Sequence, residues 1–172
     1  MYKFTLFTWA RMNFERIDSY ELSQTILNKI GGVSHLKLQK LIYYIDAWHL
    51  AILDEPLIND EFEAWLHGPV IRSIYAKYVG NGFNMYDRLS FNKDQAEVHS
   101  NAIEAKLHAD QNELISDVLA EYGDKSDYHL ECLTHSEEPW IEARKGVAQG
   151  EASRNIISKE TMKRFYAQNI GS

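Results

Sequence analysis

The sequence of 172 residues contains a single cysteine, Cys132, and no run that approaches the roughly 20 apolar residues of a membrane-spanning helix. One cysteine excludes an internal disulfide and a cysteine-rich zinc site, which is typical of a protein in the reducing cytoplasm. The N-terminal residues MYKFTLFTWAR are interrupted by polar side chains and lack the small-residue cleavage site of a signal peptide. We therefore expect a cytoplasmic protein.

Positive charge is also scarce in this sequence. The chain has 18 Lys and Arg residues against 25 Asp and Glu residues, which leaves a formal net charge of −7. Binding to nucleic acid phosphates and to anionic membranes depends on clustered basic residues. The charge balance therefore argues against direct contact with nucleic acid and against a membrane partner.

The motifs of common catalytic sites are missing. There is no G-x-S-x-G nucleophile turn, no glycine-rich phosphate loop and no dinucleotide-binding fingerprint. His129, Cys132 and His135 are spaced to share roughly one side of a helix, but no fourth ligand completes a structural zinc site. A small buried cysteine with two partly exposed histidines is the favoured interpretation. Glu63, His135 and Glu138 supply an acid–base pair only if a strand lies against the 134–140 loop. We expect no enzyme activity, no cofactor and no metal.

The pattern of apolar residues predicts one mainly helical domain. Apolar types make up 45% of the chain and charged types 25%, close to the globular average. The longest periodic segment follows the capping residue Ser34 and stops at 54–56, and its apolar stripe predicts a one-sided helix. The remaining sides of that helix carry Lys37, Gln39, Lys40 and Asp46. In all, the sequence predicts six or seven helices and one or two short strands. The other helices are expected at 18–30, from Pro69 to Gly80, around 114–122, from Ser126 through Leu133, from Pro139, and at 159–167.

A short strand is expected where apolar and polar residues alternate at 61–67. Its buried face carries Phe62, Ala64 and Leu66. Its outer face carries Glu63, Trp65 and His67. Trp65 is either an exposed anchor for a partner or a residue packed on Trp140, and the sequence leaves both open. A loop at 134–138 is expected to lead into the helix at Pro139.

Residues 35–75, HLKLQKLIYYIDAWHLAILDEPLINDEFEAWLHGPVIRSIY, resemble the signature of the SocA-like antitoxins, also called the Panacea domain. The family pattern runs K-L-x-K-L-L-Y-Y-A, W-x-L-A, P-L, F-E-A-W and G-P-V, and closes on a tyrosine. It is matched here at Lys37, Lys40, Tyr43, Trp48, Phe62, Gly68 and Pro69. A second block at 130–144, LECLTHSEEPWIEAR, is similar to the family's L-x-x-L-T-H-x-E-x-P-W and includes Thr134 and Pro139.

A third block at 156–166 resembles the closing helix of the family, so the resemblance covers 18–167. The expected division of the chain is therefore a SocA-like domain at 18–170 and an N-terminal extension at 1–17. In that extension Tyr2, Phe4 and Leu6 alternate with other side chains as in an edge strand. An exposed apolar strand tends to associate with other surfaces, so we expect the extension to pack on the domain or on a partner.

The resemblance implies a binding function. Family members act as the neutralising half of bacterial and phage toxin–antitoxin pairs, and they inactivate a cognate protein toxin, usually encoded by the adjacent gene, by direct complex formation. One member instead delivers its toxin to a ClpXP-type protease. The expected function is therefore that of a non-enzymatic antitoxin. The alternatives are a proteolytic adaptor for a ClpXP-type protease and, outside the family, a His/Glu-dependent hydrolase.

The candidate toxin-binding residues lie on the outer face of the predicted strand and beside it. They are Glu63, Trp65, His67, His135, Glu138 and Trp140. Gly68 and Pro69 are expected to fix the exit of the strand and so to hold the outward side chains in place. Less conformational freedom is then lost when a partner binds.

Overall fold

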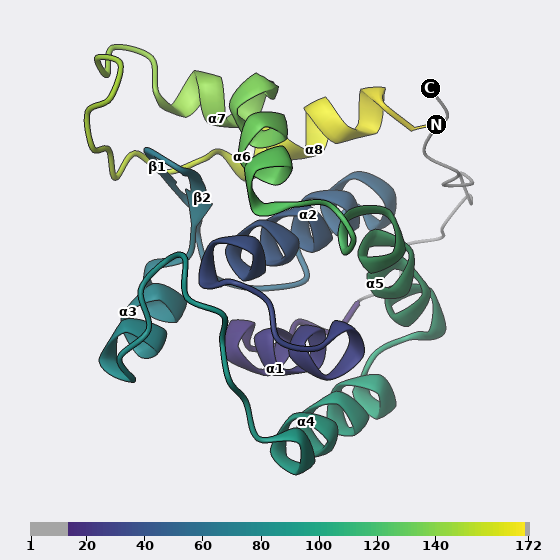
Figure 1. The fold of residues 1–172 in the computed structure, drawn as a ribbon. Coiled ribbons are helices and arrows are strands. Elements are labelled where there is room, and N and C mark those ends of the chain that lie inside the picture. The colour runs from purple at the N-terminus through teal and green to yellow at the C-terminus, as the bar shows by residue number, and fades with distance from the viewer. Residues whose placement is uncertain (1–13, 171–172) are drawn as a thin grey trace.

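The structure is a computed structural model, and it describes residues 14–170. Within these residues the chain forms eight α-helices and two short β-strands (Figure 1). In chain order they are α1 Ser19–Ile30, α2 His35–Leu53, β1 Glu63–Trp65, β2 Gly68–Val70, α3 Arg72–Gly80, α4 Lys93–Lys106, α5 Ala109–Tyr122, α6 Asp127–Ser136, α7 Glu138–Ala143 and α8 Lys159–Gln168. The predicted class, a mainly helical single domain with a little strand, is confirmed. In the range described, every helix is too short or too polar to cross a membrane.

The helix α2 lies at the centre of the domain, with α6, α7 and α8 on one side and α1 and α4 on the other (Figure 1). It begins at Ser34, whose hydroxyl accepts a hydrogen bond from the Lys37 N–H at 3.0 Å. Sixteen of its 19 residues are buried, so the expected one-sided helix is wrong. Gln39, Lys40 and Asp46 are completely enclosed because each one binds the backbone of a segment that covers the helix.

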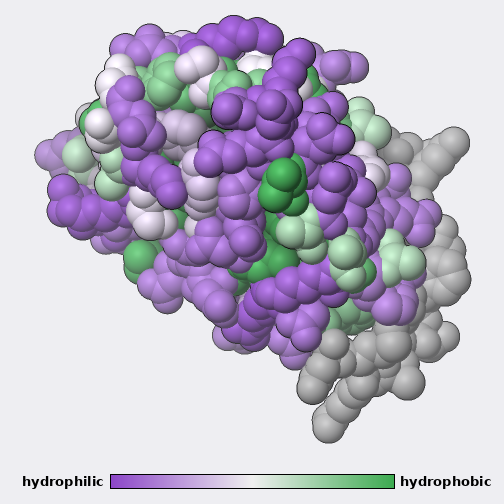
Figure 2. All heavy atoms as spheres, turned by 90° about the horizontal axis from the view of Figure 1, so that it is seen from below, coloured by the Kyte–Doolittle hydropathy of each residue, from purple (hydrophilic) through white to green (hydrophobic). Residues whose placement is uncertain are grey.

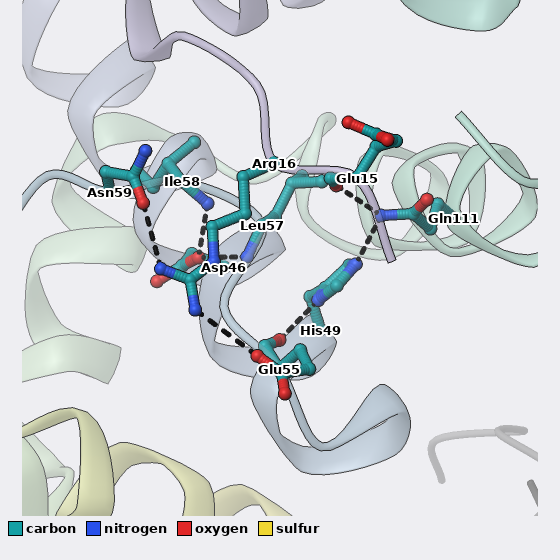
Figure 3. Close-up of polar contacts among 9 residues, drawn as sticks. All are labelled: Glu15, Arg16, Asp46, His49, Glu55, Leu57, Ile58, Asn59 and Gln111. Carbon is teal, nitrogen blue, oxygen red and sulfur yellow. Dashed lines mark hydrogen bonds and ion pairs between the residues drawn. The ribbon is translucent and has the colours of Figure 1, made fainter. Parts of the chain in front are cut away.

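Asp46 shows how such a buried polar residue organises a loop (Figure 3). Its Oδ1 accepts hydrogen bonds from the backbone N–H groups of Leu57 at 2.8 Å and Ile58 at 3.1 Å. Its Oδ2 pairs with the ammonium group of Lys159 at the start of α8. One carboxylate of α2 therefore joins the 57–58 segment and α8 to the central helix.

His49, one turn further along α2, is linked through Gln111 to the chain that precedes α1 (Figure 3). Its Nδ1 donates to the Glu55 carbonyl oxygen at 2.5 Å, so Nε2 is the acceptor of the 2.9 Å bond from Gln111 Nε2 on α5. Burial lowers the pKa of His49, which agrees with a neutral ring in this arrangement. Gln111 Nε2 also donates to the Glu15 carbonyl oxygen at 2.9 Å.

Residues 14–17, the end of the predicted extension, therefore lie against α5 and the loop after α2. Ile17 is buried, with 3% of its surface exposed, and its N–H donates to the Leu57 carbonyl oxygen at 2.9 Å. The edge strand predicted from Tyr2, Phe4 and Leu6 lies outside the described residues.

The segment after β1 differs from its prediction. Pro69 does not begin a helix but lies in β2, and α3 starts only at Arg72. β1 and β2 form an antiparallel hairpin in which Ala64 is opposite Pro69, with Leu66 and His67 as the turn. Leu66 is therefore not buried as expected: 36% of its surface is exposed, because the alternation of strand residues ends at Trp65.

Two helical segments also differ from the prediction. The loop expected at 134–138 is mostly helix, since α6 continues to Ser136. The hydroxyl groups of Thr134 and Ser136 bond to backbone carbonyls three residues earlier, which satisfies these turn-forming side chains inside the helix. The helix α4 has no counterpart in the prediction, because it buries only Ala96, Ser100 and Ile103 and so carries little periodic apolar signal.

The buried role of Asp46 predicts a large difference between two aspartates that both pair with lysines of α8. Asp46→Asn removes the charge opposite Lys159 in a buried site, and we expect it to lower the free energy of unfolding by about 2–3 kcal/mol. Asp54→Asn affects the exposed pair with Lys163 and is expected to change the stability by less than about 0.5 kcal/mol. Urea denaturation of both variants measures this, and equal losses would contradict the assigned role.

Candidate functional site

The hairpin β1–β2 is the framework of the candidate site. A third segment extends it beyond β1: the Ala64 N–H donates to the Asn155 carbonyl oxygen and the Ile157 N–H to the Phe62 carbonyl oxygen, both at 2.8 Å. Arg144 donates from Nη1 to the Ala64 carbonyl oxygen at 2.8 Å. Both edges of β1 are therefore occupied, and its backbone is held in place.

The hairpin rests on α2 and α6 through two side chains of the family pattern. Buried Lys40 donates from Nζ to the Pro69 carbonyl oxygen at 3.1 Å. Gly68 has φ +98°, and a Cβ there would lie 2.6 Å from Lys40 Cε and 2.7 Å from Thr134 Oγ1. Only glycine fits this position without displacing its neighbours. The approach of the turn to the helices therefore depends on Gly68.

A pocket of about 270 Å³ opens beside the turn of the hairpin. Its walls come from the hairpin, from the loop before α4 and from the segment before α8. The lining residues are Trp65, Leu66, His67, Val70, Met85, Ala152, Ser153 and Arg154. Apolar side chains from distant parts of the sequence thus meet at an opening on the surface.

Trp65 is half-buried at the wall of this pocket. Its ring packs edge-on against Tyr75 with 4.7 Å between centroids, and its Nε1 donates to Glu63 Oε2 at 2.6 Å. The indole is therefore held by two neighbours while part of its surface faces the pocket. Glu63 and Trp65 lie together, as the sequence predicted for one face of the strand.

His67 occupies the turn and is also held from two sides. Its Nδ1 lies 2.9 Å from Glu131 Oε1 on α6, and its Nε2 lies 3.4 Å from the hydroxyl of Tyr86. Tyr86 is 61% exposed. Together, Leu66, His67 and Tyr86 give the rim of the pocket an exposed surface with apolar and aromatic character.

The candidate toxin-binding residues predicted at 135–140 separate into two groups. Trp140 donates from Nε1 to the Trp65 carbonyl oxygen at 3.0 Å, and its ring stacks on His135 at 4.0 Å. Burial lowers the pKa of His135, which keeps this stacked ring neutral near pH 7. Glu138 instead forms an ion pair with Arg164 of α8 at 3.2 Å. The structure therefore brings Trp140 to the backbone of β1 and directs Glu138 toward α8.

The other residues of the family pattern build the core beneath the site. Tyr43, Trp48 and Phe62 have no exposed surface, and Trp48 donates from Nε1 to the Tyr122 hydroxyl at 3.0 Å. Pro139 is buried in the first turn of α7. Lys37 donates from Nζ to the Lys125 carbonyl oxygen at 2.7 Å. These side chains support the site from below.

A buried carboxyl joins three helices in the same core. Glu137 accepts hydrogen bonds from the Tyr44 hydroxyl at 3.2 Å and from the Tyr166 hydroxyl at 2.6 Å. Burial raises the pKa of Glu137 to about 7. The residue between α6 and α7 is thereby tied to α2 and α8.

The residues considered for zinc do not converge. Among residues 14–170, no three His, Cys, Asp or Glu side chains are arranged to hold a metal ion. Cys132 is exposed, so the expectation of a buried cysteine is wrong. The reason is the orientation of α6, which turns Leu130 and Thr134 toward the core and position 132 toward the opposite side.

Several residues at the pocket were not predicted from the sequence, among them Leu66 as an exposed residue, Met85 and Arg154 in the lining, and Tyr86, which contacts His67. Met85, Tyr86 and Arg154 lie in loops at 81–92 and 144–158, where no periodic pattern marks which side chains face a site. Their positions follow from the docking of these loops around the hairpin.

The fold and the site define a helical protein with an apolar surface pocket built on a rigid hairpin. The chain belongs to the antitoxin SocA-like, Panacea domain family, whose model matches residues 38–141 and so includes α2, both strands and α6. It is 29% identical to Antitoxin SocA of Caulobacter vibrioides (strain NA1000 / CB15N) over 131 residues, which cover 73% of this chain and 70% of that protein. The family suggested by the sequence is thus confirmed. No solved structure matches the chain.

The close contact of Gly68 with Lys40 and Thr134 predicts that adding one methyl group at this position strongly lowers the stability of the fold. Gly68→Ala adds both a strained φ and a clash, and we expect it to destabilise the fold by about 2–5 kcal/mol. Gly82→Ala is the matched control, because Gly82 has φ +86° but no atom within 4 Å of the added Cβ. It should cost about 1–2 kcal/mol. Thermal and urea unfolding compare the two, and a Gly68→Ala variant no weaker than its control would refute the tight contact.

The burial of Lys40 predicts a pH dependence of stability. Desolvation lowers the pKa of Lys40 from 10.5 to about 7, so between these values the unfolded chain binds more protons than the folded one. Stability contributed by this group therefore rises with pH from about 7 toward 10.5, by at most about 1.4 kcal/mol per pH unit. Lys40→Met removes the titrating group. The difference in unfolding free energy between wild type and Lys40→Met should grow in favour of wild type across pH 7–10, and a constant difference would show that the pKa is not lowered.

Proposed function

We propose that this chain is the antitoxin of a toxin–antitoxin pair and that it neutralises a protein toxin by binding it directly. The observation that supports this most is the family match, since it spans the helix and the hairpin on which the pocket is built. The relative from Caulobacter vibrioides carries the name Antitoxin SocA. The proposed partner is a toxin encoded by the adjacent gene, and the proposed action requires no catalysis.

The surface proposed for the toxin is the pocket and its rim. Exposed aromatic and aliphatic side chains beside a pocket are typical of the centre of a protein interface. Here Leu66 and Tyr86 are exposed, and half-buried Trp65 lies at the wall of the pocket. Hydrogen bonds hold the side chains of Trp65 and His67 in place before a partner binds, which reduces the conformational entropy lost on binding.

Another face of the molecule is largely polar. Figure 2 shows the face seen from below, to which α1, α3 and α4 contribute, and it is mostly hydrophilic with small scattered hydrophobic areas. The hairpin lies away from α4, at the other end of the domain (Figure 1). The polar character of the face in Figure 2 makes it a poor candidate for an apolar interface.

Co-expression tests the proposed function. The product of the adjacent gene is produced alone and together with this chain, and growth, complex formation and the amount of toxin are measured. Direct neutralisation predicts rescue of growth, co-purification of the two proteins and an unchanged amount of toxin. A fall in toxin that requires a ClpXP-type protease would instead indicate an adaptor, and an absence of rescue would contradict the antitoxin assignment for that pair.

Substitutions at the pocket predict a loss of toxin binding without loss of the fold. Trp65→Ala removes a central aromatic side chain and is expected to weaken binding by about 2 kcal/mol, or roughly 30-fold. Leu66→Asp places a charge on the exposed turn and should weaken binding similarly with little effect on folding. Val98→Ala on α4, where the side chain is 67% exposed, is the control and should bind as wild type. Calorimetric affinity and melting temperature are both measured. Unchanged affinity in both pocket variants would rule out this surface.

A further inference from the structure

The pocket beside the hairpin turn also indicates what part of a partner it accepts. We propose that it receives one large apolar side chain of the toxin, and that Arg154 pairs with a carboxylate next to that side chain. This inference rests on the proposed function, because it specifies the chemistry of the toxin segment that the same surface binds.

The volume of the pocket suits a side chain. An apolar cavity of roughly 150 Å³ holds a benzene molecule, whereas sites for cofactors and drug-sized ligands span roughly 300–1,000 Å³. At about 270 Å³ the pocket lies between these sizes, with space for a side chain such as Leu, Phe or Trp. Most of its walls are apolar, with Trp65, Leu66, Val70 and Met85 among them.

One charged side chain at the pocket has no polar partner among residues 14–170. His67 is paired with Glu131, and the Glu63 carboxylate accepts the hydrogen bond from the Trp65 indole. Arg154 lines the pocket and is exposed, and within residues 14–170 its side chain has no hydrogen bond or ion pair. A carboxylate is the complementary group, since a guanidinium binds it through two parallel hydrogen bonds.

The backbone around Arg154 is fixed on both sides. Arg144 donates from Nη2 to the Glu151 carbonyl oxygen at 2.6 Å. On the other side, Asn155 donates from Nδ2 to the Ala143 carbonyl oxygen and accepts the Ala64 N–H at its own carbonyl, both at 2.8 Å. The backbone position from which Arg154 extends beside the apolar walls is therefore set by β1 and α7. The geometry favours a partner segment in which an apolar residue and an Asp or Glu are close together.

Charge reversal tests this assignment on the complex of the full chain with its toxin. Arg154→Glu is expected to weaken toxin binding at least 30-fold, because a carboxylate then faces a carboxylate. Arg154→Lys keeps the charge but loses the paired hydrogen bonds, and it should give an intermediate loss. Lys93→Glu on α4 makes the same change of net charge on an exposed residue away from the hairpin and should leave the affinity within about twofold. The decisive measurement is compensation: changing the matching Asp or Glu of the toxin to Arg should restore binding to Arg154→Glu.

A second probe does not require the toxin. Random heptapeptides displayed on phage are selected on the immobilised full chain and, in parallel, on Arg154→Glu and on Leu66→Asp. The inference predicts that peptides with a large apolar residue beside Asp or Glu are enriched on wild type, and that this enrichment disappears on both variants. Enrichment that ignores acidic residues, or that persists on Arg154→Glu, would overturn it.

The outcomes separate the two proposals. In one outcome the toxin is bound and neutralised, Trp65→Ala and Leu66→Asp lower the affinity for it, and Arg154→Glu binds it like wild type. The proposed function then stands and the role of Arg154 is wrong. If the wild-type chain selects peptides with an apolar residue beside an acidic one but does not rescue growth when the product of the adjacent gene is expressed, the pocket chemistry stands. The antitoxin assignment for that pair is then wrong.

Discussion

The complete burial of α2 is the constraint on which the rest of the structure depends. A buried polar group without a partner costs about 1–3 kcal/mol, which favours an arrangement that provides partners for the polar side chains of this helix. Gln39, Lys40 and Asp46 find their partners in the backbone of the segments at 57–58 and 69–71. The central helix thus determines where both the hairpin and the loop after α2 lie.

The hairpin, which carries the proposed binding surface, is held in place by hydrogen bonds of this kind. Three carbonyl groups of the hairpin accept side-chain hydrogen bonds: that of Pro69 from Lys40 on α2, that of Trp65 from Trp140 on α7, and that of Ala64 from Arg144 at the end of α7. With the backbone held in this way, the remaining freedom belongs to side chains such as Leu66 at the turn. A surface of this kind loses little conformational entropy when a partner binds, which is favourable for an inhibitory complex.

Two buried ionisable groups show how the core tolerates polar chemistry. Burial lowers the pKa of Lys40 and raises that of Glu137, in each case to about 7. Both shifts favour the neutral form, because a charge in a region of low dielectric is costly without a close counter-ion. Neutral partners, a carbonyl oxygen for Lys40 and two tyrosine hydroxyls for Glu137, are then sufficient. These two residues fasten the hairpin and the α6–α7 junction to α2.

The sequence by itself determined the elements whose signals are local. The caps at Asp18, Ser34 and Ser158 and the apolar periodicity of α1, α2, α5 and α8 were sufficient to predict these helices, and the spacing of the motif blocks was sufficient to identify the family. The alternation of a strand also placed Glu63 and Trp65 on one face, whereas the hydrogen bond between them was seen only in the structure. Local signals depend only on neighbouring residues, and these are visible along the chain.

Tertiary structure alone decided what depends on contacts between distant segments. Pro69 lies in a strand because it pairs with Ala64 of β1, and its carbonyl oxygen accepts a hydrogen bond from Lys40, which is 29 residues away. The polar side chains of α2 are buried because other segments cover them, and the pocket exists because Met85 and Arg154 arrive beside Trp65 from separate loops. Sequence periodicity does not encode such long-range contacts. Each one requires the closure of a long loop, and the entropy cost of that closure is offset only when the whole core is assembled.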